Sequence, residues 1–331
     1  MAVSKNTATT VVLITGCSAG GIGHHLALEF ATAHKCKVYA SARDVTKISV
    51  DLQNKGITPV ALDVTNQASV DSAIAFVQKD AGCNIDILVN NAGQICVSPV
   101  VEVDVNQAQR IFDTNVIGVT RVCKAVAPQM MDNRHGTIVN VGSVSGYATT
   151  PWVGYYAASK AALHMLTDAM RMELAPFNVR VVLLAPGGII SNLHANGKAI
   201  LSKDSRYGSV RNQVDERAKL SQAGSATPTT QFASVVVPKL LMRNPPAYIT
   251  YGNHSALMWI AYYLPWWMRD YFAGGRFGTR KLAQEMALSA SSGNSSGRCP
   301  VTNPKVLLTT AMGAVGVVAF IYIVRTMYLD R

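Results

Sequence analysis

Residues 11–23 read VVLITGCSAGGIG and decide the fold of this 331-residue chain. The first five are apolar or β-branched and predict a short buried strand. A glycine-rich loop follows, and apolar residues then recur at helical spacing from His24 to Ala33. Strand, glycine loop and helix in this order are typical of a dinucleotide-binding unit, because glycines let the backbone approach a pyrophosphate and a helix N-terminus attracts negative charge.

The same loop also fits a second motif. Residues 16–20, GCSAG, match the Gly-x-Ser-x-Gly elbow that presents a nucleophilic serine between a strand and a helix. A serine lipase using Ser18 is therefore an alternative function. It would also need an acid and a histidine in a recognisable context further along the chain. Four later histidines lack such a context: His135, His164, His194 and His254.

Short apolar runs alternate with helical patterns through the first 190 residues. After residues 11–15, the predicted strands are Lys37–Ser41, Val60–Leu62, Ile85–Val89, Gly136–Val141 and Val179–Leu184. The helical patterns lie at residues 69–79, 105–131 and 156–175. This alternation predicts the α/β class, with a doubly wound parallel sheet (Rossmann-type) and helices on both faces.

Polar and glycine residues gather where these predicted strands end. Ligands of such sheets bind outside the carboxyl ends of the strands, so we expect these residues to lie together. Arg43 is the first charged residue after the second strand, and Asp44 follows it. An arginine there suits the 2′-phosphate of NADP, whereas an acid suits the ribose 2′-hydroxyl of NAD. The order of the two favours NADP(H).

Tyr156 and Lys160 form a candidate proton-transfer pair. Residues four apart on a helix share one face, so the ammonium can lie beside the phenol. A nearby cation should lower the pKa of a tyrosine from its usual value of about 10. Tyr156 would then exchange a proton near neutral pH. An exposed helical pair is the alternative for the motif taken alone.

Taken together, these motifs resemble the short-chain dehydrogenase/reductase family. Residues 15–23 match its glycine motif with one extra residue, and residues 90–93, NNAG, match its sheet-stabilising motif. The resemblance implies a catalytic tetrad of Asn115, Ser143, Tyr156 and Lys160. It also implies a set of cofactor-binding residues: Gly16, Ser18, Gly21, Ile22, Gly23, Arg43, Asp63, Asn91, Tyr156, Lys160, Pro186, Gly187, Ile189 and Ser191.

A closer resemblance, over residues 8–281, is to fungal NADPH-dependent 1-acyldihydroxyacetone-phosphate reductases. It rests on the glycine loop and on residues 243–249, RNPPAYI, and 276–278, RFG. It implies reduction of a lipid-like ketone, 1-acyldihydroxyacetone phosphate, to 1-acylglycerol 3-phosphate. A similar glycine loop occurs in steroid and retinol dehydrogenases, so a steroid or retinoid dehydrogenase is the alternative within the family.

The rest of the chain differs in composition from the expected reductase domain, residues 8–253. Within that domain, the polar and basic residues 191–234 are expected to form a lid over the substrate. Aromatic residues dominate 254–285 and suit either a membrane interface or a pocket wall. Residues 286–304 are rich in Ser, Gly and Asn and predict a flexible linker. The apolar residues 305–325 predict a transmembrane tail anchor.

Charge and cysteine content restrict the partners. The net charge is +11, and residues 191–331 carry 16 Lys and Arg against 6 Asp and Glu. No nucleic-acid-binding module is present, so the basic excess indicates a membrane or an anionic substrate. The six cysteines lack metal-ligand spacing, so no metal is expected. We expect a catalytic domain in the cytosol, anchored to the endoplasmic reticulum, a lipid droplet or the mitochondrial outer membrane; a homo-oligomer is a family expectation.

Overall fold

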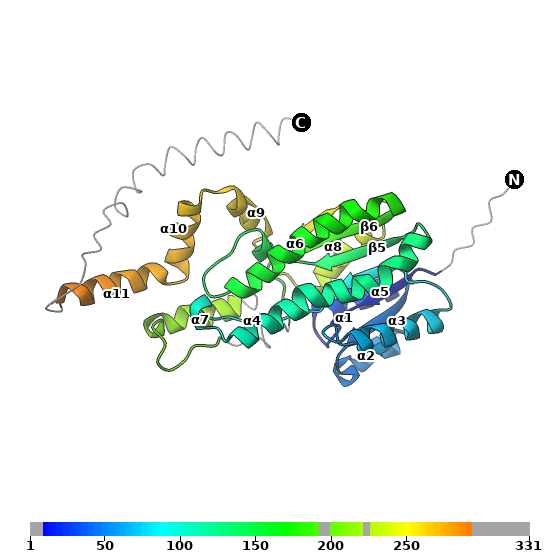
Figure 1. The fold of residues 1–331 in the computed structure, drawn as a ribbon, viewed down its shortest axis with the longest axis horizontal. Coiled ribbons are helices and arrows are strands. Elements are labelled where there is room, and N and C mark those ends of the chain that lie inside the picture. Colours follow the sequence, from blue (N-terminus) through cyan, green and yellow to red (C-terminus); the bar gives the residue numbers. More distant parts are fainter. Residues whose placement is uncertain (1–8, 192–198, 221–225, 293–331) are drawn as a thin grey trace, which may run out of the picture. The chain divides into compact units, whose positions relative to one another are not determined.

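A parallel sheet forms the centre of the computed structural model, which describes residues 9–191, 199–220 and 226–292. Within these residues, the strand order is β3-β2-β1-β4-β5-β6-β7. Figure 1 labels β5 and β6 of this sheet and the helices of the fold. The order reverses between β1 and β4, which opens a crevice at the carboxyl ends of these two strands. The strands are β1 (Val11–Ile14), β2 (Lys37–Ala42), β3 (Thr58–Ala61), β4 (Ile87–Asn90), β5 (Gly136–Val141), β6 (Val179–Pro186) and β7 (Tyr248–Tyr251).

Helices α1 (Ile22–Thr32), α2 (Val50–Asn54) and α8 (Thr229–Leu240) cover one face of the sheet, and α3 (Gln67–Ala81), α5 (Gly118–Asp132) and α6 (Gly154–Leu174) cover the other. The other α-helices of the described residues are α4 (Val105–Phe112), α7 (Arg211–Lys219), α9 (Ser255–Tyr263), α10 (Trp266–Arg276) and α11 (Thr279–Ser292). A π-helical turn, η3 (Asp113–Ile117), joins α4 to α5. Fold class and layer order therefore agree with the sequence prediction.

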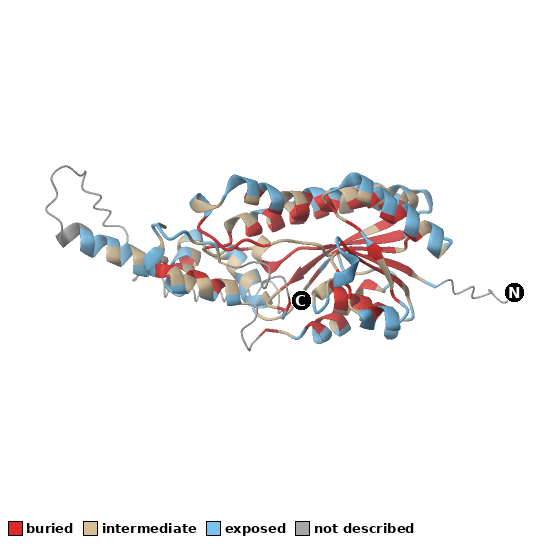
Figure 2. Ribbon diagram, turned by 90° about the horizontal axis from the view of Figure 1, so that it is seen from below, coloured by how far each residue is buried: buried red, intermediate tan, exposed pale blue. Residues whose placement is uncertain are grey.

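Alternate residues of each strand enter two separate cores. Val12 and Ile14 pack with the apolar faces of α1, α2 and α8, whereas Val11 and Leu13 pack with those of α3, α5 and α6. Figure 2 shows the resulting buried centre, with exposed residues on the outer faces of the helices. Because both faces are covered, the central strand β1 is fully buried and reads as a short continuous apolar run in the sequence.

Two compact units make up the chain, Met1–Ala283 and Gln284–Arg331. The first unit contains the predicted reductase domain, residues 8–253, together with most of the predicted aromatic segment, residues 254–285. Strand β7 was not predicted, because it is only four residues long and follows two prolines. The predicted lid also extends too far, since α8 begins at Thr229 and buries Phe232 in the sheet core.

The predicted linker begins too early. Helix α11 continues to Ser292, whereas the linker was expected from residue 286. The Ser289 hydroxyl donates a hydrogen bond to the Glu285 carbonyl 3.0 Å away, which satisfies the side chain within the helix. The predicted tail anchor at 305–325 lies outside the described residues. Among the residues described, no helix combines the length and apolar character needed to cross a membrane.

Candidate active site

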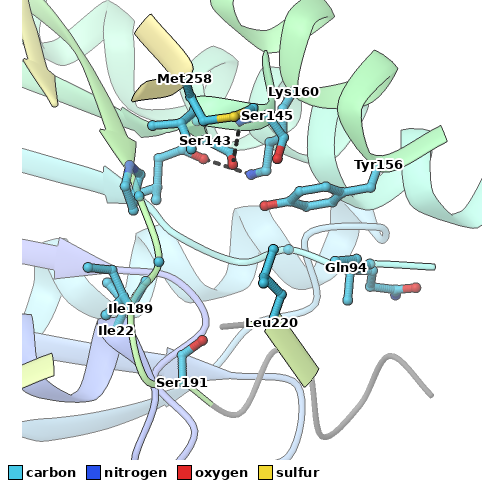
Figure 3. A pocket seen from close by; sticks show the side chains of 18 of the residues that line it. Ile22, Gln94, Ser143, Ser145, Tyr156, Lys160, Ile189, Ser191, Leu220 and Met258 are labelled. Carbon is cyan, nitrogen blue, oxygen red and sulfur yellow. Dashed lines mark hydrogen bonds between the residues drawn. The ribbon is translucent and has the colours of Figure 1, made fainter. Parts of the chain in front are cut away.

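One large cavity of about 630 Å³ lies at the carboxyl ends of the strands. We call one side the glycine-loop half; it is lined by Gly16, Ser18, Gly21, Ile22, Arg43, Asp63 and Asn91. We call the other side the helical half; it is lined by Thr150, Arg217, Leu220, Leu257, Met258, Ala261, Leu264, Arg269, Phe272 and Arg276. Ser143, Tyr156 and Lys160 also line the cavity, and Figure 3 shows the Tyr156 phenol pointing into the space beside the other two.

Backbone geometry shapes the glycine-loop half. Gly16 has a φ of +74°, and a Cβ there would lie 2.7 Å from the Cα of Ala92. The Asn91 amide donates to the carbonyls of Thr15 and Gly16, both at 2.9 Å, and so ties the loop to the end of β4. A Cβ on Gly23 would lie 2.5 Å from Asn91 Nδ2. Gly23 therefore allows the loop to pack, but it does not line the cavity.

The start of α1 is open to an anion. Its N-cap is Gly21, no side chain caps it, and its first turn contains no acidic residue. Unpaired backbone N–H groups at a helix N-terminus bind phosphate groups. Together with the close backbone approach at Gly16, this arrangement fits the pyrophosphate of a dinucleotide.

Arg43 and Asp44 have separate roles at the end of β2. Arg43 is exposed and lines the cavity. The Asp44 carboxylate instead accepts hydrogen bonds from the backbone N–H and the hydroxyl of Thr46, at 3.0 and 2.6 Å, and these bonds lower its pKa. Asp44 thus caps the turn η1 (Val45–Lys47) and does not line the cavity. The basic residue is the one presented to a ligand.

Burial controls the titration of Tyr156. The residue is 7% exposed, and burial raises the pKa of its phenol, while a hydrogen bond with Ser143 and the charge of Arg217 oppose the rise. The expectation that Lys160 lowers this pKa is wrong for the structure. The ammonium lies 6.0 Å from the phenol ring centroid, and the loss of solvent around the phenol dominates.

Lys160 is itself buried and directed at the backbone. Its Nζ donates to the carbonyl of Val141 at 2.7 Å (Figure 3). Burial lowers the pKa of Lys160 from 10.5 to about 8. The ammonium is therefore charged at neutral pH but close enough to its pKa to exchange a proton.

A histidine holds the turn that presents Ser143. The backbone N–H of Ser143 donates to Nε2 of His164 at 3.3 Å. The ring packs so closely that a Cβ on Gly142 or Gly146 would lie 2.4 or 2.5 Å from it. Burial and the charge of Lys160 lower the pKa of His164 to about 4, so the ring is neutral at neutral pH. A neutral ring can accept this hydrogen bond.

Asn115 lies behind the cavity and does not line it. It is fully buried in the π-turn η3, a type of distortion that often marks functional sites. Its amide donates to the Gln94 carbonyl and to the Ser159 hydroxyl, both at 2.9 Å, and its Oδ1 accepts from the Gln94 backbone N–H. The Ser159 hydroxyl in turn donates to the Tyr156 carbonyl at 2.7 Å. Asn115 thus connects the loop after β4 to the Tyr156 turn of α6.

Most predicted site residues meet at this cavity. All of the predicted residues except Gly23 and Asn115 line it. Sequence reasoning did not assign Arg217, Arg269 or Arg276 individually to the cavity. Arg217 lies in the predicted lid, residues 191–234, and Arg269 and Arg276 lie in the aromatic segment, residues 254–285, which suited either a membrane interface or a pocket wall. No local signal separates them from solvated charges.

Comparison with known proteins gives the family. The short chain dehydrogenase family model matches residues 10–199. A short-chain dehydrogenase from Penicillium ochrochloron is 35% identical over 261 residues, covering 78% of this chain and 94% of that protein. An NADPH-dependent 1-acyldihydroxyacetone phosphate reductase from Schizosaccharomyces pombe is 34% identical over 237 residues, covering 70% and 78% respectively.

A solved structure agrees with this assignment. The crystal structure of a short-chain dehydrogenase from Burkholderia cenocepacia in complex with NADP has a TM-score of 0.58 at 26% identity, covering 76% of this chain and 91% of that chain. The chain therefore belongs to the short-chain dehydrogenase family and is an oxidoreductase. Family membership confirms the predicted resemblance and removes the serine-lipase alternative, since Ser18 belongs to the glycine loop of an oxidoreductase.

Proposed function

We propose that this protein uses NADPH to reduce a lipid-like ketone, and that 1-acyldihydroxyacetone phosphate is converted to 1-acylglycerol 3-phosphate. One observation carries the proposal: Tyr156, Ser143 and Lys160 meet in a cavity whose opposite wall is built from apolar side chains of α9 and α10. An acyl chain suits such a wall. The fungal relatives named as reductases of this phospholipid ketone support the choice of substrate.

The preference for NADP(H) rests on the end of β2. Arg43 lines the cavity, and the carboxylate of Asp44 is turned away to cap η1. A guanidinium can bind the 2′-phosphate that distinguishes NADP from NAD. Asp63, after β3, would contact the adenine, and residues 186–191 would contact the nicotinamide side.

The proposed mechanism assigns one task to each polar residue. Bound NADPH supplies the hydride that reduces the carbonyl carbon. The Tyr156 phenol, kept protonated by its raised pKa, donates its proton to the carbonyl oxygen. The Ser143 hydroxyl donates a hydrogen bond to the same oxygen and stabilises its developing charge. Lys160, with a pKa of about 8, restores the proton to Tyr156, and Asn115 holds the turn of α6 that carries the phenol.

We further propose that α9 and α10 lie at a membrane surface. Five aromatic side chains on these helices are exposed and do not line the cavity: Trp259, Tyr262, Tyr263, Trp266 and Tyr271. Aromatic side chains with flanking arginines favour the bilayer interface. The same two helices line the cavity, so a lipid could pass from the bilayer to the reacting residues along one surface. The predicted tail at 305–325 would hold the enzyme at an endoplasmic reticulum, lipid droplet or mitochondrial outer membrane.

Oxidation of NADPH, followed at 340 nm, tests the reaction. The detergent-solubilised full chain would be given 1-acyldihydroxyacetone phosphate, a steroid ketone and retinal, each with wild type and Tyr156→Phe. We expect turnover of the phospholipid ketone, and a loss of roughly 10²–10⁴-fold in kcat in the variant, because the proton donor is removed. Binding of NADPH, measured by fluorescence, should persist in the variant.

The other outcomes of this assay are equally informative. Turnover of the steroid or retinal alone would retain the mechanism and replace the substrate. Undiminished turnover by Tyr156→Phe would overturn the proposed proton donor. Membrane contact is tested separately by vesicle flotation of a chain ending at residue 292. Trp266→Ser should weaken binding to vesicles and Val101→Ser, a similarly exposed change away from α9 and α10, should not; equal binding by all three would contradict the interface.

A further inference from the structure

Arg217 is a buried cation in the wall of the helical half. It is 7% exposed, and its Nε donates to the Thr150 hydroxyl at 2.9 Å. Its guanidinium lies 5.8 Å from the centroid of the Phe277 ring. No carboxylate of the described residues lies within ion-pair distance of this guanidinium. Buried charges are normally paired, because loss of water around an unpaired charge is costly.

A second arginine lies on the same ring. The Arg276 guanidinium is 6.0 Å from the Phe277 centroid. Burial lowers the pKa of Arg217 to about 10, and the charge of Arg276 adds a smaller lowering. Both side chains line the cavity, and Arg269 and His254 add further basic groups there. Among the described lining residues, Asp63 is the one carboxylate, and it follows the edge strand β3 in the glycine-loop half. The helical half thus presents positive charge without a described counter-ion.

The position of Arg217 relates this charge to the reacting groups. Arg217 lies on the ring of Phe277, and Phe277 and Tyr156 belong to one buried apolar cluster, so the guanidinium and the phenol line the same part of the cavity. An anionic group on Arg217 would therefore lie close to a carbonyl placed at Tyr156. The two groups on the ligand must then be separated by only a few bonds.

We propose that Arg217 and Arg276 form an anion subsite that binds a phosphate monoester attached a few bonds from the reducible carbonyl. The inference deepens the proposed function and rests on it for the position of the carbonyl. It selects phosphorylated ketones from the wider class of lipid-like ketones. Apolar residues of α9 and α10 line the remainder of this half and suit the chain of the same substrate.

A matched pair of variants tests the subsite. Arg217→Gln removes the buried cation, whereas Lys219→Gln removes an exposed one from the same helix that does not line the cavity. The substrates are 1-acyldihydroxyacetone phosphate, its dephosphorylated form and dihydroxyacetone phosphate, which lacks the acyl chain. For the phosphorylated ketones, we expect Arg217→Gln to lower kcat/KM by about 10–100-fold, the value of a charge-assisted hydrogen bond.

With the dephosphorylated ketone, Arg217→Gln should lower kcat/KM much less. Lys219→Gln should have the kcat/KM of wild type on all three substrates. Arg276→Gln should show the same selectivity, and because Arg276 is exposed this variant is expected to fold. Equal loss on phosphorylated and dephosphorylated ketones would overturn the subsite. An equal wild-type kcat/KM for dihydroxyacetone phosphate and for its acylated form would place a small phosphorylated ketone, rather than a lipid, in the subsite.

Binding of inorganic phosphate separates this inference from the proposed reaction. Calorimetric titration of the full chain with NADP⁺ bound should show phosphate binding that Arg217→Gln and Arg276→Gln weaken and Lys219→Gln does not. Such binding without reduction of any ketone would retain the subsite and refute the proposed function. Ketone reduction by wild type, with phosphate binding unchanged in Arg217→Gln, would retain the proposed function and refute the subsite.

Discussion

In the glycine-loop half of the cavity, close backbone packing at glycines shapes the loop, whereas in the helical half side chains from α7, α9 and α10 line the wall. A Cβ added at Gly16 or Gly23 would lie less than 3 Å from a neighbouring heavy atom, and the Asn91 side chain fixes the loop with two hydrogen bonds. The helical half instead holds Arg217 through one bond to Thr150 and through the Phe277 ring. The glycine-loop half therefore accepts one ligand shape, whereas substitution of side chains in the helical half can change the ligand that it binds.

The largest expected effect tests how far backbone geometry controls the glycine-loop half. Gly16→Ala adds a Cβ at positive φ and 2.7 Å from the Ala92 Cα, so we expect a loss of about 3 kcal/mol in the free energy of unfolding and loss of NADP(H) binding. Gly56→Ala is the control, because Gly56 has a φ of +77° but no heavy atom lies within 4 Å of the position of an added Cβ. It should lose only about 1 kcal/mol. Equal losses in urea unfolding would contradict the tight packing at Gly16.

A side chain decides specificity even in the glycine-loop half. Arg43→Gln should lower kcat/KM for NADPH by roughly 10–100-fold and leave that for NADH within a factor of about three, because one charge-assisted contact to a phosphate is removed. Asp44→Asn is the comparison variant, since Asp44 caps η1. It should change stability more than cofactor preference. A lower kcat/KM for NADH together with a higher one for NADPH in Asp44→Asn would mean that Asp44 faces the ribose.

The smallest expected effect concerns the turn between the two halves. The pKa of His164 is about 4 in the folded chain and 6.5 in the unfolded chain, so the unfolded chain binds more protons between these values. Stability should therefore fall as the pH is lowered from 6.5 to 4, by about 1 kcal/mol between pH 6.5 and 5.5. Urea midpoints at these two pH values would measure it.

His164→Gln should be less stable at neutral pH but lose this part of the pH dependence, since Gln can accept the Ser143 hydrogen bond without titrating. His135→Gln, on the surface, should retain the wild-type slope. If stability depends on pH equally in His164→Gln and wild type, a group other than His164 causes this pH dependence.

The contrast between the halves also explains what the sequence could predict. The glycine loop and the Tyr156–Lys160 pair depend on short spacings along the chain, and the structure places both where they were expected. The position of Arg217 depends instead on Val210 and Val214 packing against Trp152 and Phe277, residues more than 50 positions away. Burial of this kind has no local signal, which is also why the direction of the Tyr156 pKa shift was predicted wrongly.

The burial of Lys160 beside the Val141 carbonyl makes ligand binding a proton-linked process. With a pKa of about 8, Lys160 is partly neutral in weakly alkaline solution. An anionic ligand in the cavity raises that pKa, so the complex must take up a fraction of a proton from the buffer. Calorimetry in buffers of different ionisation enthalpy would register this uptake, and affinity for an oxidised or a reduced dinucleotide would weaken as the solution becomes more alkaline.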